Sequence, residues 1–202
     1  MTDEASVAGL SCGGACVRRR GHRHLECRHR RAAAIETMDT AMWRRSMDVN
    51  ATGHFLVARE GLRLMRRQGL GGAFVFIASK NVPAPGKDFA AYSAAKAAET
   101  QLARIVAIEG ADIGVRANTI HPDAIFEGSG LFSPELRAGR AAAHGIKSDD
   151  LEEFYRTRNL LRTRVFAEDV AEAALFLASD RAAKTTGAAL AVDGGVREAF
   201  PR

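Results

Sequence analysis

The pattern of apolar and polar residues changes its period several times along the chain, and each change predicts a different element. Residues 73–77 form a continuous apolar run, which is typical of a strand buried on both faces of a parallel sheet. Residues 115–121 and 188–192 are predicted as two further strands, which end at Pro122 and at Asp193. The sequence therefore predicts three strands.

Amphipathic segments separate these strands, and the apolar spacing of the segments predicts helices. Gly69 follows one of them at the position where a glycine commonly ends a helix. Because strands alternate with helices, we expect an α/β fold with a doubly wound, Rossmann-like parallel sheet. The expected helices are residues 36–47, with Thr37 or Asp39 as N-cap, and 49–68, 90–110, 133–158 and 167–179, of which 133–158 begins with a Ser-Pro pair.

The charge of the chain is concentrated near its N-terminus. The 202 residues carry a formal charge of +5, but residues 18–31 alone contribute seven Arg and one Glu. The other 188 residues hold 22 positive and 23 negative charges, so the predicted α/β domain is nearly neutral. The sequence thus divides near residue 32 into a basic segment and a single domain, with no internal repeat.

Several classes of protein are excluded or disfavoured by composition. No apolar run approaches the roughly 18 residues of a membrane span, and a 47% hydrophobic content argues against disorder of the whole chain. Asp3 and Glu4 at the N-terminus, with no apolar core behind them, disfavour a secretory signal. Because residues 32–202 contain no cysteine, we expect a cytoplasmic protein.

The helix predicted over 90–110 carries the most suggestive chemistry. Tyr92 and Lys96 are four residues apart, so both side chains lie on one helical face. An ammonium group near a phenol favours the phenolate, which suits a general acid/base acting on an alcohol or carbonyl. Ser79 follows the first predicted strand, and Asn50 stands at the start of the preceding helix. Alternatively, Asn50 is a simple N-cap and Ser79 bonds its own backbone.

With these residues in order, the chain from about residue 35 onward resembles the short-chain dehydrogenase/reductase family. The resemblance also covers Val115 to Pro122 and the segment from Thr186 to Gly195. It implies hydride transfer between NAD or NADP and an alcohol/carbonyl pair. The residues it implies as catalytic are Asn50, Ser79, Tyr92 and Lys96.

The resemblance implies a separate role for each of these residues. Tyr92 exchanges a proton with the substrate oxygen, and Ser79 hydrogen-bonds that oxygen. Lys96 supports the tyrosine and holds the nicotinamide ribose, while Asn50 anchors a water of the proton relay. Tyr92, Lys96, Pro122 and Ile125 are the implied cofactor contacts, although Asp123 stands where the family has Gly. Glu127 likewise replaces a Thr. The family also implies a homodimer or tetramer, joined through the helices that bear Asn50 and Tyr92.

A narrower resemblance concerns residues 78–81, 121–131, 141–145 and 196–202. These segments resemble the dehydrogenase half of bifunctional rhamnulose-phosphate aldolase/short-chain dehydrogenase proteins. That resemblance implies oxidation of lactaldehyde or a related sugar fragment. Nothing in the sequence resembles the aldolase half.

Residues 1–31 do not match the family, and we expect them to be disordered. The family begins with strands and a Gly-rich turn that seats the pyrophosphate, and these are missing, so the fold is expected to be incomplete and N-terminally truncated. Read one base later, the codons for residues 16–30 can encode a buried strand followed by Asn-Ala-Gly, which the family has at this place. We therefore hypothesise that a frameshift produced residues 1–31, and the nucleotide sequence tests this.

Two other interpretations of the N-terminal segment are weaker. Cys12, Cys16, Cys27 and His29 could supply four zinc ligands, but the last two are closer together than in common zinc sites. The arginines could form a nucleic-acid arm, but no aromatic residues lie between them. We expect no metal, no nucleic acid and no membrane among the partners, and a small molecule as substrate.

Two functions remain in competition. The first is an NAD(P)-dependent short-chain dehydrogenase. The second is a truncated, inactive pseudo-enzyme that retains only the helical association surface. Losing the first strands would turn the strand at 73–77 into an exposed edge, so we expect weak or no NAD(P) binding and poor solubility.

Overall fold

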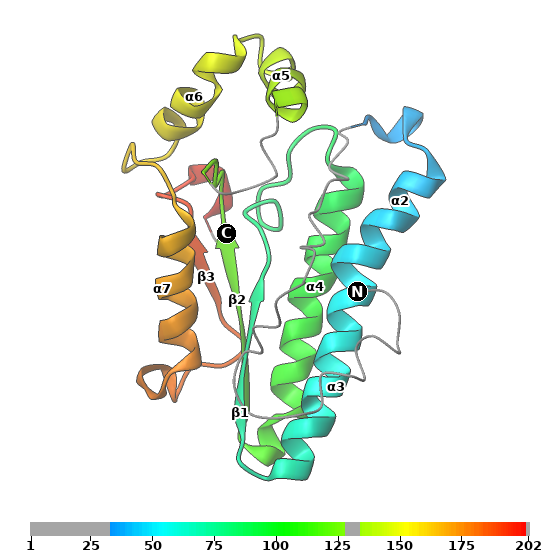
Figure 1. Ribbon diagram of the computed structural model, residues 1–202, viewed down its shortest axis with the longest axis vertical. Coiled ribbons are helices and arrows are strands. Elements are labelled where there is room, and N and C mark those ends of the chain that lie inside the picture. Colours follow the sequence, from blue (N-terminus) through cyan, green and yellow to red (C-terminus); the bar gives the residue numbers. More distant parts are fainter. Residues whose placement is uncertain (1–32, 128–133, 201–202) are drawn as a thin grey trace.

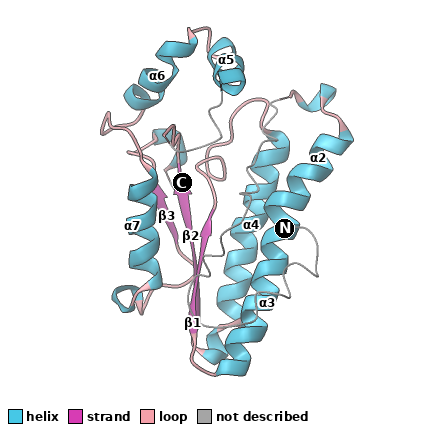
Figure 2. Cartoon of the chain, in the orientation of Figure 1, coloured by secondary structure: helices cyan, strands magenta, loops and turns pink. Residues whose placement is uncertain are grey.

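The structure is a computed structural model, and it describes residues 33–127 and 134–200. Strands and helices alternate as the apolar pattern predicted (Figures 1 and 2). In chain order they are α2 (Thr40–Met47), α3 (Gly53–Gln68), β1 (Gly72–Ile77), α4 (Ala90–Glu109), β2 (Val115–Pro122), α5 (Pro134–Ala143), α6 (Leu151–Arg158), α7 (Ala167–Ala178) and β3 (Ala189–Val192). A π-helical turn, Asp48–Thr52, joins α2 to α3 without a break.

The three strands form one parallel sheet in the order β1-β2-β3. Gly72 pairs with Val115 at one end of β1, and Ile77 pairs with Ile120 at the other. Helices α3 and α4 cover one face of the sheet and α7 covers the other (Figure 1). The predicted α/β Rossmann-like class is therefore confirmed, in a partial form with three described strands.

Two apolar clusters fix the layers, because successive side chains of a strand point to opposite faces. On one face, Phe76 and Ala117 pack against α3 and α4. On the other face, Ile120 packs against Val170 and Leu177 of α7. The central strand β2 is buried along nearly its whole length, although its sequence includes Arg116, Asn118, Thr119 and His121.

The edge strand β1 is less buried than its sequence suggests. Phe76 is buried, but Ile77 is 40% exposed and residues 73–75 are only partly covered. Within the described part of the chain, β1 pairs with β2 alone. Both faces of β1 are covered as predicted, since Phe74 and Phe76 pack on the α3–α4 side and Val75 on the α7 side. Burial is incomplete because no described strand pairs with the second edge of β1. An apolar strand with an open edge is prone to associate with other chains.

The single helix predicted over residues 133–158 is also wrong. The segment forms α5 and α6, separated by Gly145 at φ 67° and by a 3-10 turn at Ser148–Asp150. This break lets Ala141 of α5 and Leu151 of α6 pack together, at 1% and 0% exposure. A continuous helix would carry these two residues apart, so burial of the pair favours the turn.

The first predicted helix also differs at its start. Asp39 accepts a hydrogen bond from the Ala41 N–H at 2.8 Å, so it caps a helix that begins at Thr40 rather than 36. The helices predicted over 49–68, 90–110 and 167–179 agree with the structure to within a few residues, and Gly69 ends α3 at φ 66°.

The predictions for residues 1–31 lie outside the described residues. They include the frameshifted segment, the nucleic-acid arm and the zinc ligands Cys12, Cys16, Cys27 and His29. Ser133, expected to open a helix, lies outside them as well. In the described part of the chain, no helix is both long and apolar enough to cross a membrane.

Candidate active site

A cleft of about 860 Å³ lies at the carboxyl ends of β1 and β2. In parallel α/β sheets, ligands bind outside this edge. The loop after β1, the start of α4 and the segment after β2 form one side, and α5 and α6 form the other. Of the residues predicted from the sequence, Ser79, Tyr92, Pro122 and Ile125 line this cleft.

Ser79 is held in place by backbone hydrogen bonds that continue the β1–β2 pairing into the loop. The Ala78 N–H donates to the Ile120 carbonyl at 2.8 Å, and the Lys80 N–H donates to the Pro122 carbonyl at 3.1 Å. The Ser79 Oγ accepts a bond from the Asn81 N–H at 3.2 Å. The local backbone bond considered from the sequence is therefore present. Because Oγ is the acceptor, its own hydrogen remains available to a ligand oxygen.

Tyr92 and Lys96 lie one turn apart on α4, and both are buried. The Lys96 Nζ donates to the Ile77 carbonyl at 2.8 Å and to the Glu99 Oε2 at 2.7 Å. The first bond ties α4 to the last residue of β1, two positions before Ser79. Lys96 thus sets the position of Tyr92 relative to Ser79 but does not itself line the cleft.

Asn50 lies in the π-helical turn between α2 and α3 and is 6% exposed. Its Nδ2 donates to the Ser46 carbonyl at 3.1 Å. The alternative that Asn50 is an N-cap is wrong, because the helix continues through it in both directions. Such π turns inside α-helices are often found at functional sites. Asn50 is not among the residues that line the cleft.

A buried carboxylate that the sequence analysis missed links Asn50 to Lys96. Glu99 is fully buried, and its Oε1 lies 3.3 Å from the His54 Nε2. The His54 Nδ1 lies 2.9 Å from the Asn50 carbonyl oxygen, which can only accept, so Nδ1 carries the hydrogen. The chain of contacts therefore runs from Asn50 through His54 and Glu99 to Lys96. Spacings of three and four residues were the signal, since Glu99 is three after Lys96 and His54 is four after Asn50.

Burial shapes the protonation of this chain of residues. It raises the pKa of the Glu99 carboxyl to about 6, although the nearby Lys96 ammonium opposes the increase. It lowers the pKa of His54 to about 4; the charge of Lys96 lowers it further, and the bond to the Asn50 carbonyl opposes both effects. The 3.3 Å contact between Glu99 and His54 is thus a contact with a neutral imidazole near pH 7, although its distance alone would suit an ion pair.

Basic side chains on the cleft were also missed. Lys80, Arg140 and Arg158 line it, and they come from the loop after β1, from α5 and from α6. Asp123, noted as a departure from the family pattern, accepts a hydrogen bond from Arg158. These residues lie on segments that are far apart in the sequence and come together only in the fold. No local sequence pattern could therefore have predicted their grouping. In the residues that the structure describes, no cluster of His, Cys, Asp and Glu forms a metal site.

Comparison with known proteins agrees with this arrangement. A family model described as Enoyl-(Acyl carrier protein) reductase matches residues 27–197. The uncharacterized oxidoreductase YuxG of Bacillus subtilis is 49% identical over 160 residues, which are 79% of this chain and 23% of YuxG. The chain also spans less than two thirds of the length of the next curated relatives.

Solved structures show the same fold. Sorbitol-6-phosphate 2-dehydrogenase SrlD from Erwinia amylovora matches 96% of this chain and 75% of its own, with a TM-score of 0.79 and 28% identity. Carveol dehydrogenase from Mycobacterium avium, in complex with NAD, matches 82% of this chain and 60% of its own, with a TM-score of 0.75 and 25% identity. Ligands of parallel α/β sheets bind outside the carboxyl edge, where Ser79 and Tyr92 share the cleft. The chain belongs to the short-chain dehydrogenase/reductase family.

Proposed function

We propose that residues 32–202 form the catalytic C-terminal portion of an NAD(P)-dependent oxidoreductase acting on the alcohol or carbonyl group of a small, sugar-derived substrate. The observation that carries this proposal is the shared cleft of Ser79 and Tyr92, with Lys96 tying the tyrosine's helix to β1. The sugar-alcohol chemistry is supported by the likeness to sorbitol-6-phosphate 2-dehydrogenase.

The chain's own residues would handle the proton. As an alcohol is oxidised, the Tyr92 phenol oxygen takes the hydroxyl proton and returns it in the reverse reaction. The Ser79 hydroxyl donates a hydrogen bond to the same substrate oxygen as charge develops there. Lys96 orients this helix face and would contact the ribose of a bound cofactor, while Asn50 would anchor a water of the proton relay. The bound nicotinamide supplies the acceptor or donor of the hydride.

The described residues fit one end of such a cofactor. Pro122 and Ile125 lie on the cleft beside Tyr92, where a nicotinamide ring would need an apolar wall. Among the described residues there is no Gly-rich turn after a strand to seat a pyrophosphate. The NAD complex of a structural neighbour supports a nicotinamide cofactor, and neither NAD nor NADP is favoured by the residues present.

Lactaldehyde is the substrate that we propose to test first. The segments that resemble aldolase–dehydrogenase fusions support it. The match covers only 23% of YuxG, so that relative is much longer than one dehydrogenase domain. The lack of cysteine after residue 31 supports a cytoplasmic location. Phe55 of α3 and Ile108 of α4, 46% and 71% exposed, support association of two copies through these helices.

A truncated pseudo-enzyme is the second candidate, and the second edge of β1, with which no described strand pairs, favours it. In the complete fold a further strand would pair with this edge and complete the nucleotide cleft. With the edge open, we expect the 202-residue chain to bind NAD(P) weakly or not at all. Its remaining activity would then be association through α3 and α4.

Calorimetric titration with NAD⁺ and with NADP⁺ separates the two candidates. Micromolar binding that Lys96→Met abolishes would support the oxidoreductase, and absence of binding would support the pseudo-enzyme. A dehydrogenase assay with lactaldehyde, with Tyr92→Phe as the inactive control, then tests the substrate. Turnover that persists in Tyr92→Phe would contradict the role given to the tyrosine.

A further inference from the structure

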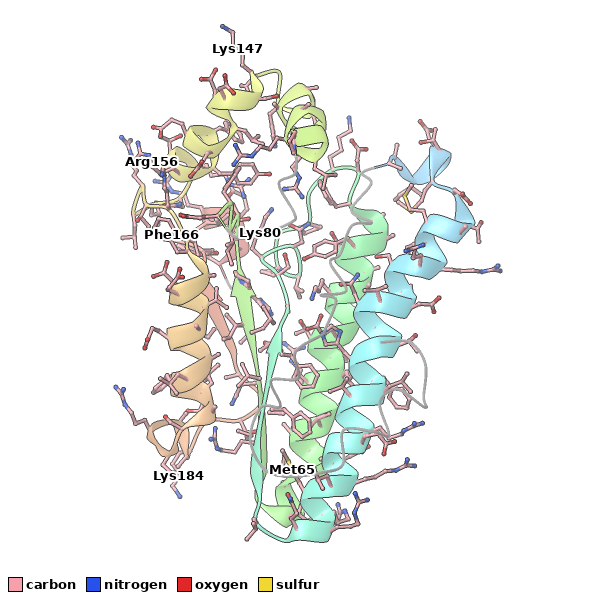
Figure 3. The ribbon with its side chains drawn as sticks, in the orientation of Figure 1. Met65, Lys80, Lys147, Arg156, Phe166 and Lys184 are labelled. Carbon is pink, nitrogen blue, oxygen red and sulfur yellow. The ribbon has the colours of Figure 1, made fainter. Side chains whose placement is uncertain are left out.

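Basic side chains gather on both sides of the cleft that holds Ser79 and Tyr92. Lys80 lies at the end of the sheet beneath α5 and α6 (Figure 3). Arg140 of α5 and Arg158 of α6 line the same cleft. Exposed Lys87 and His144 stand at its border, and the acidic residues on it are Asp88 and Asp123.

One carboxylate, that of Asp123, lies near Lys80 and Arg158. Asp123 is 9% exposed and is bonded to Arg158. The Arg158 Nε is buried and has no hydrogen-bond partner among the described residues. The Lys80 Nζ contacts a carbonyl oxygen, that of Ala84, at 3.2 Å, and makes no ion pair with any residue in the described ranges. Arg140 stacks over the Phe89 ring at 5.1 Å, which holds its guanidinium in place.

Gathering like charges in a half-buried cleft costs free energy, because each cation raises the potential at the others. Burial lowers the pKa of Lys80; Asp123 opposes this, while Arg158 and Arg140 lower it further. The same three cations lower the pKa of His144 beyond the effect of its burial. Titratable groups whose pKa values are shifted by burial and by one another's charge, gathered in one cleft, are a common mark of a ligand site.

We propose that these cations bind an anionic group of the substrate, a phosphate or a carboxylate, with Lys80 and Arg140 as its ligands. This inference rests on the proposed function, since it names the class of substrate that the cleft takes. Arginine offers paired N–H donors that match both oxyanions, and lysine adds a compact charge. A cleft of about 860 Å³ has room for a small substrate that places its anion here and its alcohol at Tyr92.

The two possible sources of the anion fit different substrates. A phosphate ester would make the substrate a sugar-alcohol phosphate, the kind of compound named for the structural relative from Erwinia amylovora. A carboxylate would make the substrate a small hydroxy acid such as lactate, whose hydroxyl group is oxidised at Tyr92. Both kinds of substrate would bind the same cations, and they differ in the chemical group that carries the negative charge.

Thermal unfolding of the chain, without cofactor, tests the proposal. We expect phosphate, sorbitol 6-phosphate or lactate to raise the Tm, while sorbitol and propane-1,2-diol, which lack the charge, leave it unchanged. Stabilisation by sorbitol 6-phosphate alone, or by lactate alone, distinguishes the two sources. Lys80→Gln and Arg140→Gln should each weaken the anion's Kd about tenfold or more, as expected for loss of a charged contact.

Lys184→Gln is the matched control, because Lys184 is exposed at the opposite end of the molecule (Figure 3). Anion stabilisation that is equal in all three variants and the unmodified chain would overturn the proposal, and so would its absence with every anion. Tyr92→Phe should bind the anion normally. Absence of NAD(P) binding together with retained anion binding would contradict the proposed function but not this inference. NAD(P) binding without any anion binding would contradict this inference but not the proposed function.

Discussion

Glu99 offers the sharpest test of how the buried residues behind the cleft are protonated. It is fully buried, and one carboxylate oxygen holds Lys96 at 2.7 Å while the other faces His54 at 3.3 Å. Glu99→Gln removes the ionisable group and keeps the shape and a hydrogen-bonding oxygen. The variant therefore separates the contribution of the Glu99 charge to the free energy of unfolding from the contribution of its side-chain packing.

The expected magnitude follows from the raised pKa. The increase from an ordinary 4.5 to about 6 corresponds to roughly 2 kcal/mol, at about 1.36 kcal/mol per pKa unit. Because the folded-state pKa lies above the unfolded one, the native state binds more protons between these values. The stabilising contribution of Glu99 is present below about pH 4.5 and is lost as the pH rises through 6.

Titration of His54 acts in the opposite direction over much of the same range. Its folded-state pKa is lowered to about 4, so its contribution is present above the unfolded value near 6.5 and is lost as the pH falls through 4. The raw pH profile of the chain therefore hides the Glu99 contribution. The difference between Glu99→Gln and the unmodified chain reveals it, and we expect that difference to shift by roughly 2 kcal/mol in favour of the variant from pH 4.5 to 7.

Urea unfolding at a series of pH values measures this difference. Trp43 of α2 is the only tryptophan of the chain and reports unfolding by fluorescence. Glu109→Gln, at the exposed end of the same helix, is the matched control and should follow the unmodified chain. A difference profile for Glu99→Gln that is flat within about 0.5 kcal/mol, or that slopes the other way, would refute the reasoning.

Three further predictions concern the fold and its open edge. Leu151→Ala should lower the free energy of unfolding by about 2–5 kcal/mol in urea titration, because it empties the α5–α6 contact at a fully buried position; a loss below 1 kcal/mol would contradict that packing. Gly145→Ala should cost about 1–2 kcal/mol, since φ is 67° there, whereas Gly139→Ala within α5 should not destabilise the chain. Ile77→Lys on the open edge of β1 should reduce sedimentable aggregate relative to the unmodified chain, and unchanged aggregation would show that another surface is responsible.

Much of the local structure could be predicted from the order of residues alone. The apolar run at β1 and the glycine that ends α3 are signals within a short window, and such signals depend on the backbone and nearest neighbours. The spacing of Tyr92 and Lys96 is likewise fixed by helical geometry. The sequence therefore determined the alternation of strands and helices, the α/β class, and the residues that line the cleft near the strand ends.

Tertiary contacts decided the rest, because they join residues that are far apart along the chain. Local periodicity could not show that α5 turns at Gly145 so that Ala141 meets Leu151. Burial of Glu99 depends on α3 packing against α4, and only that packing turns an ordinary helix-surface acid into a site with a raised pKa. The grouping of Lys80, Arg140 and Arg158 depends on three separate segments meeting at one sheet edge, and the open edge of β1 depends on which strands are there to pair with it. Charges and burial act through distance in space, so the chemistry of the cleft is a property of the folded chain.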